Sequence, residues 1–188
     1  MAGTIISSSG ESGDILRIFA VTDNVIFTFT YRSGRETQQF QGMCCIGSSK
    51  VIMVEDSIGV LMEALCKFKP VTAVKFWRLR VYNTIYYSLE YHRTHSRNSY
   101  TVRFGDNQYG VIQYFIAVNS GSDSFVFAIV SVLLVQQFRN LPHLFMAQDT
   151  GFVKPIFAKS VVSKCVSLIF GSNFFIGVFP SSVLPLLS

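Results

Sequence analysis

The chain has 188 residues, of which 49% are hydrophobic and 14% are charged, against roughly 25% charged residues in an average globular domain. This composition excludes a disordered chain, because the apolar surface is large enough to offset the entropy lost on folding. The apolar residues are mainly Phe, Val, Ile and Tyr, which suit a half-buried pleated sheet better than a helix.

The first part of the chain, residues 14–69, follows a serine- and glycine-rich segment over residues 1–13 that we expect to be a disordered tail. A helix is predicted over Glu55–Phe68, because its apolar residues recur at i, i+3, i+4 and i+7 and Pro70 follows its end. Apolar runs between turn residues predict strands over Ile15–Val21, Val25–Tyr31, Glu36–Cys45 and Val51–Val54.

The second part, residues 70–188, consists of short apolar runs separated by turn residues. Its spacing predicts a β-barrel-like module, so the fold class is mainly β with one helix, as a small barrel or sandwich. The predicted strands are Ala73–Val81, Thr84–Tyr91, Tyr100–Phe104, Tyr109–Val118, Phe125–Gln136, a short one near Phe145, Val166–Phe170 and Phe174–Phe179, and Ser160–Cys165 is either one helical turn or the start of a strand.

No membrane span is expected, although Cys165–Ser188 carries no charge. The turn at Gly171 and the prolines Pro180 and Pro185 divide that stretch into pieces of strand length, well short of the roughly 20 residues that a membrane helix needs. The four cysteines form no C-x-x-C pair, which favours buried thiols in a reducing, intracellular compartment.

An enzyme is not expected, because no nucleotide-binding or nucleophile motif is present and most carboxylates fall in turns or at the helix start, where they have structural roles. His92 and His95 have a spacing that two ligands of one metal can adopt, but the polar loop around them favours two solvated histidines instead. We therefore predict no catalytic residue, no metal and no cofactor.

The basic residues gather in one stretch. Between positions 75 and 103 only Glu90 opposes six cations, so this segment alone carries the net charge of +5 of the whole chain. Such a stretch can bind phosphate, or its arginines can occupy the ordinary solvent faces of strands. The candidate contacts are Arg78, Arg80, Arg93, Arg97 and Arg103.

Aromatic residues crowd the same stretch. Rings interleaved with arginine can stack on bases or form a cage for a methylated lysine, whereas alternate rings on a strand can also be core. Tyr86 and Tyr91 are the stacking candidates. Because Tyr86 and Tyr87 are adjacent, we expect one of the two to point to solvent.

From Trp77 onward, the chain resembles a β-rich module of animal proteins that are derived from transposable elements and similar to CACTA (En/Spm-like) transposases. The blocks that carry this resemblance are Phe76–Ser88, Glu90–Tyr91, Arg97–Val102, Tyr109–Ile116, Val161–Val166 and Val178–Pro180. The resemblance implies a nuclear, genome-derived module, loosely like a bromo-adjacent-homology barrel, that lies downstream of a nuclease region. It implies no catalytic residue here.

The expected function is that of a non-catalytic accessory module of a transposon-derived protein, cut from a longer polypeptide and contacting nucleic acid or chromatin. The alternative is a protein–protein interaction or structural module with no nucleic-acid binding, which includes a decayed fragment of such an element.

Overall fold

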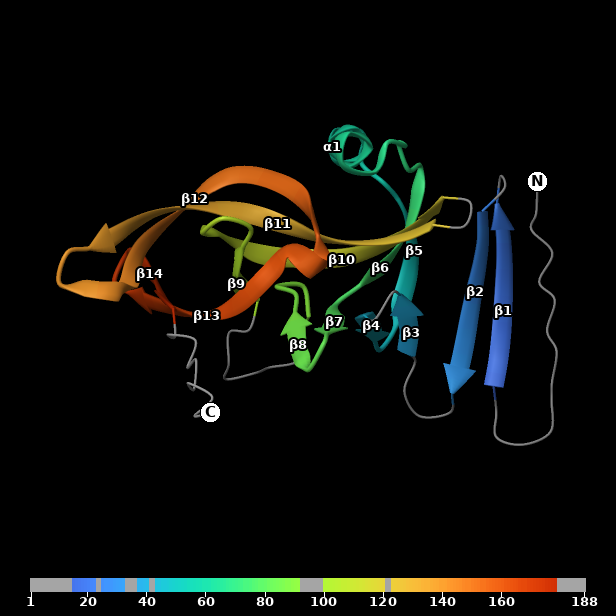
Figure 1. Cartoon of the computed structure of the whole chain (residues 1–188), viewed down its shortest axis with the longest axis horizontal. Coiled ribbons are helices and arrows are strands. Elements are labelled where there is room, and N and C mark those ends of the chain that lie inside the picture. Colours follow the sequence, from blue (N-terminus) through green and yellow to red (C-terminus); the bar gives the residue numbers. More distant parts are fainter. Residues whose placement is uncertain are drawn as a thin grey trace, which may run out of the picture.

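The computed structural model describes residues 15–22, 25–32, 37–40, 43–91, 100–120 and 123–178, and side chains from residue 43 onward within these ranges. It confirms a mainly β fold with a single helix among these residues (Figure 1). The tail expected over residues 1–13 lies outside them. In chain order the elements are β1 (Ile15–Thr22), β2 (Val25–Arg32), β3 (Thr37–Phe40), β4 (Met43–Ile46), β5 (Ser49–Met53), α1 (Asp56–Cys66), β6 (Thr72–Phe76), β7 (Arg78–Val81), β8 (Thr84–Tyr87), β9 (Thr101–Phe104), β10 (Gln108–Ser120), β11 (Asp123–Phe138), β12 (Leu141–Phe157), the 3₁₀ turn Ala158–Ser160, β13 (Val161–Phe170) and β14 (Asn173–Val178).

Two sheets form a sandwich-like arrangement. The larger sheet has the order β11-β12-β14-β13-β9-β10-β6-β5, and β10 also pairs with β11, so hydrogen bonding closes a ring through β10, β11, β12, β14, β13 and β9. The smaller sheet has the order β3-β4-β7-β8. The ring does not make the molecule a true barrel, because β6 and β5 continue the large sheet beyond it. Of the two architectures that the sequence predicts, the sandwich is therefore the one observed.

The main core lies where the two sheets face each other. Leu79 and Tyr86 of the small sheet belong to the same buried cluster as Phe76, Phe104 and Phe115 of the large one. In β10 and β11 successive side chains point to opposite faces, as the strand period requires. Phe115 therefore points to the core between the sheets, while its neighbour Ile116 points to the other face.

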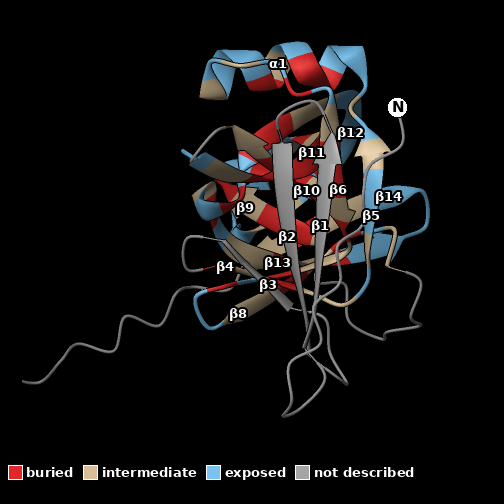
Figure 2. Ribbon diagram, turned by 90° about the vertical axis from the view of Figure 1, so that its right-hand side faces the viewer, coloured by how far each residue is buried: buried red, intermediate tan, exposed pale blue. Residues whose placement is uncertain are grey.

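Helix α1 covers that other face. Ile58 and Met62 of α1 are buried against Ile116 of β10 and Phe127 of β11, and Figure 2 shows the helix lying over these strands with its exposed side turned outward. The helix ends where Lys67 takes a left-handed conformation, with φ of 63°. Its position and its apolar stripe confirm the helix predicted from periodicity.

The two predicted parts of the chain, residues 14–69 and 70–188, both contribute strands to the large sheet and to the small sheet. Strand β4 pairs with β7, and β5 pairs with β6, so strands from either side of that position are neighbours. Met43 and Cys45 of the first part are buried in the same cluster as Val74 of the second. The expected boundary therefore does not separate two cores.

Two predicted strands are divided and one is much longer than expected. The strand predicted over Ala73–Val81 breaks at Trp77, because β6 belongs to the large sheet and β7 to the small one. The strand predicted over Glu36–Cys45 is the β3–β4 hairpin. Strand β12 extends over Leu141–Phe157, where only a short strand was expected.

Within the described residues, no helix combines the length and the apolarity that crossing a bilayer requires.

Candidate functional site

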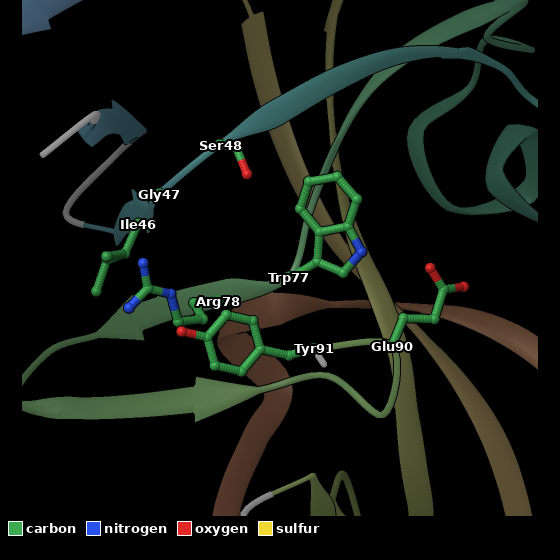
Figure 3. A pocket seen from close by; sticks show the side chains of 7 residues that line it. All are labelled: Ile46, Gly47, Ser48, Trp77, Arg78, Glu90 and Tyr91. Carbon is green, nitrogen blue, oxygen red and sulfur yellow. The ribbon is translucent and has the colours of Figure 1, made fainter. Parts of the chain in front are cut away.

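A pocket lies where the chain passes three times between the two sheets. Gly47 and Ser48 join β4 of the small sheet to β5 of the large one, and Trp77 joins β6 of the large sheet to β7 of the small one. The segment after β8 brings Glu90 and Tyr91 to the same place. The pocket has a volume of about 470 Å³ and is lined by Ile46, Gly47, Ser48, Trp77, Arg78, Glu90 and Tyr91 (Figure 3).

Backbone hydrogen bonds fix the segment that carries Glu90 and Tyr91. The Ser88 N–H donates to the Trp77 carbonyl at 2.9 Å, and the Leu89 N–H donates to the Ile112 carbonyl of β10 at 2.7 Å. These bonds tie the segment to the crossing point at Trp77 and to the large sheet. The pocket wall is therefore built on paired backbone, which favours a preformed site.

Arg78 lies against an aromatic surface. Its guanidinium carbon is 5.0 Å from the centre of the Tyr91 ring, within the range of a cation–π contact. The Tyr91 ring in turn lies 5.5 Å from the Tyr87 ring, centre to centre. Among the described residues Arg78 forms no ion pair.

Gly47 leaves the space that the Arg78 side chain occupies. Its φ is +91°, a conformation that favours glycine, and a Cβ at this position would lie 2.6 Å from an Arg78 guanidinium nitrogen. Glycine therefore suits this crossing point for two reasons: it readily adopts the positive φ, and its lack of a Cβ leaves room for the Arg78 guanidinium.

Lys75 and Glu90 neutralise each other beside the pocket. The Lys75 ammonium lies 2.6 Å from a Glu90 carboxylate oxygen and 3.9 Å from the centre of the Tyr114 ring. The Lys75 side chain is only 17% exposed. The basic stretch therefore presents less charge to solvent than its sequence indicates, and Glu90 repels an anion less than a lone carboxylate would.

Two of the predicted arginines lie together on one face. Arg78 and Arg80 alternate along β7 with Leu79 and Val81, which are buried in the core. Both arginines therefore point to the outer face of the small sheet, and Arg80 is exposed. Of the predicted arginine contacts that the structure describes, these two lie on the outer face of the small sheet.

The tyrosine pair follows the alternation expected of a strand. Tyr86 lies opposite Leu79 and is 5% exposed, whereas Tyr87 lies opposite Arg78 on the outer face. Burial also raises the pKa of the Tyr86 phenol. Tyr86 therefore presents no ring face to a ligand, and Tyr87 takes the outer position, next to the stacking candidate Tyr91.

Arg103 belongs to a different region. It lies on β9 opposite Tyr109 and Ser163, and its charge opposes the effect of burial, which raises the pKa of Tyr109 and of Cys165. Its Nε is buried and has no hydrogen-bond partner among the described residues. Arg103 is thus turned toward the interior of the strand ring rather than toward the face of Arg78.

The remaining predicted residues lie outside the described part of the chain, namely Arg93, Arg97, His92 and His95. In the described ranges, no three His, Cys, Asp or Glu side chains gather closely enough to hold a metal ion. All four cysteines are free thiols.

The sequence did not single out several pocket residues. Trp77 and Glu90 were visible only as members of an aromatic and charged stretch, and Gly47 and Ser48 carried no functional signal. The one available sign was a single tryptophan beside an arginine.

No family model, curated protein or solved structure matches the chain.

Proposed function

We propose that this protein is a non-catalytic binding module that contacts nucleic acid through the outer face of β7 and the adjoining pocket. The observation that carries the proposal is that Arg78 and Arg80 lie side by side on that face, next to the Tyr91 ring and the pocket tryptophan Trp77. The sequence resemblance adds the setting of a transposon-derived, nuclear protein acting on nucleic acid or chromatin.

The charges and rings of this face are complementary to a polynucleotide. Arginine binds phosphate through several donors at once, and phosphate contacts supply most of the sequence-independent affinity for nucleic acid. Aromatic rings beside such cations stack on unpaired bases. The nearest carboxylate that lines the same pocket as Arg78 is Glu90, which is paired with Lys75.

Fluorescence anisotropy of a labelled single strand and a labelled duplex, at low and at moderate salt, tests the proposal. We expect binding by the wild type that weakens as salt rises, and a loss of roughly tenfold in affinity at low salt for Arg78→Ala, Arg80→Ala. Arg139→Ala is the matched control, since Arg139 is an exposed arginine near the turn between β11 and β12. Absence of binding at low salt would refute the proposal.

A separate observation favours the alternative, a protein–protein interaction module. Met146, Phe175 and Leu168 are direct neighbours across β12, β14 and β13 and lie on one face of the large sheet. Phe138 packs on Phe175 at 6.1 Å between ring centres, and Phe170, further along β13 on the same face, is 80% exposed. Contiguous exposed apolar surface of this kind is typical of contacts between proteins.

Sedimentation at increasing protein concentration tests whether this apolar face associates with a second copy. Association by the wild type that disappears in Leu168→Lys supports the alternative. A monomer at all concentrations removes self-association as the role of this face.

A further inference from the structure

A second pocket lies where β12 runs between β11 and β14 (Figure 1). It has a volume of about 510 Å³, which is in the range of small-ligand sites. Its walls come from β11, from β12, and from the start of β14 with the turn before it. It shares no lining residue with the pocket at the crossing points, so it is a separate candidate site.

Strand register sets apolar and amide side chains side by side in this pocket. Leu134 of β11 lies opposite Gln148 of β12, and Gln136 of β11 lies opposite Met146 of β12. All four residues line the pocket. Residues directly opposite each other, and residues at alternate positions of one strand, share a face of a sheet. The four side chains therefore form one group in which each apolar residue has an amide as its direct neighbour.

The uncharged polar side chains of the pocket are available to a ligand. Gln136, Gln148, Ser172 and Asn173 line the pocket, and their side chains form no hydrogen bond with other described residues. The register of β14 with β12 places Asn173 on the same face as Gln148. An amide carries both an N–H donor and a carbonyl acceptor, and a hydroxyl group also does both. A matching ligand must therefore donate and accept hydrogen bonds.

These groups select a neutral ligand with hydroxyl groups. Of the described residues that line the pocket, only Asp149 is charged, and its Oδ1 accepts hydrogen bonds from the Ser131 hydroxyl at 2.8 Å and from the Gly151 N–H at 2.9 Å. A carboxylate in the wall disfavours an anion. An ammonium ligand has donors only, so it would leave the amide N–H groups unpaired. A hydroxyl group matches the amides and the carboxylate alike.

We infer that this pocket binds one pyranose ring of a neutral carbohydrate. The ring hydroxyls exchange hydrogen bonds with the amides of Gln148 and Asn173. The C–H groups of the sugar pack on Leu134 and Met146, which are 65% and 38% exposed. A pyranose suits such a wall because its hydroxyls project from the ring while its C–H groups form apolar patches. The pocket is separate from the face of β7, so this binding is independent of the proposed contact with nucleic acid.

NMR titration of the isotope-labelled protein tests sugar binding, because the side-chain amide signals of Gln136, Gln148 and Asn173 report directly on this pocket. Glucose, mannose and galactose are titrated separately into the millimolar range, with ethylammonium and inorganic phosphate as charged probes. We expect saturable shifts of these amide signals with at least one sugar and with neither ion. Gln148→Leu should weaken the binding of that sugar by about fivefold, since a sugar hydroxyl then lacks its partner.

Gln137→Leu is the matched control, because Gln137 is an exposed glutamine of β11 that does not line the pocket. This variant should bind the sugar as tightly as the wild type does. Gln148 is also exposed, so both variants should fold, which circular dichroism checks. Absence of saturable shifts with all three sugars would overturn the inference, and so would equal sugar affinity of the wild type and Gln148→Leu. Saturable shifts with ethylammonium alone would overturn it in favour of a cationic ligand.

Discussion

The Lys75 ammonium lies 2.6 Å from a Glu90 carboxylate oxygen, and the Lys75 side chain of this ion pair is only 17% exposed. The two residues come from strand β6 and from the segment after β8, so the pair joins separate parts of the chain. Because the pair cancels one positive charge of the basic stretch with one negative charge, the proposed contact with a polyanion relies on Arg78 and Arg80.

The ion pair should contribute modestly to stability. We expect Lys75→Met and Glu90→Gln each to lower the free energy of unfolding by about 1 kcal/mol, since Glu90 remains 39% exposed and solvent screens such pairs. Urea unfolding of both single variants and of the double variant gives the coupling energy. Strictly additive effects would mean that the pair makes no energetic contribution.

Gly47→Ala should impair the site without removing a charge. The added Cβ would meet the Arg78 guanidinium, and alanine is strained at a φ of +91°, which costs about 1 to 3 kcal/mol. We expect lower stability in urea unfolding and weaker single-strand binding, comparable to that of Arg78→Ala. Single-strand binding equal to that of the wild type would show that binding does not depend on the present position of the Arg78 side chain. Gly105→Ala is a matched control, because Gly105 has a φ of +48° with open space around it.

Phenylalanines in the core and on the apolar face should differ sharply in their contribution to stability. Phe115 is 0% exposed and lies between the sheets, whereas Phe170 is 80% exposed. Phe115→Ala should therefore lower the free energy of unfolding by about 3 to 5 kcal/mol, and Phe170→Ala should change it by less than about 0.5 kcal/mol. Urea titration of both variants measures the difference, and a large loss for Phe170→Ala would mean that its face is covered in solution.

Stability should fall in alkaline solution, in part because of Cys165. Burial raises the pKa of this thiol from its ordinary value of 9.0 to about 11, so the unfolded chain releases the proton at a lower pH than the folded one. Stability is therefore lost as pH rises from about 9 to about 11, by on the order of 2 kcal/mol from this group. Cys45, whose pKa burial also raises, acts in the same direction.

Unfolding free energies at pH 8 and pH 10.5 for the wild type and Cys165→Ala isolate the contribution of Cys165. We expect a smaller decrease between the two pH values in the variant. The same decrease in both proteins would mean that the Cys165 thiol titrates alike in the folded and unfolded chains.

The helix and most strands could be predicted from local patterns. The spacing of Ile58 and Met62 indicates an apolar helix face whatever it packs against, and turn residues mark the hairpin between β10 and β11. Strand β12 is much longer than the strand that the sequence predicted there, because most of its central residues are exposed and show no alternation of buried and exposed positions. Its conformation is imposed by pairing with β11 and β14 rather than by its own alternation.

The site was less predictable than the fold. The alternation rule indicated that either Tyr86 or Tyr87 faces solvent, but which of them does so depends on the side of β8 that meets Leu79. The pocket joins residues 46–48, 77–78 and 90–91, and only the pairing of distant strands brings these segments together. A basic stretch in the sequence likewise did not reveal that Lys75 is neutralised or that Arg103 is turned inward.

The most direct test of the central claim is the salt dependence of single-strand binding. The slope of the logarithm of the binding constant against the logarithm of salt concentration counts the phosphates that the protein neutralises. We predict that the slope becomes shallower by about 0.7 for Arg80→Ala and by about twice that for Arg78→Ala, Arg80→Ala, and that Arg139→Ala leaves it unchanged. A slope that is the same in all four proteins would contradict the assignment of nucleic-acid binding to the face of β7.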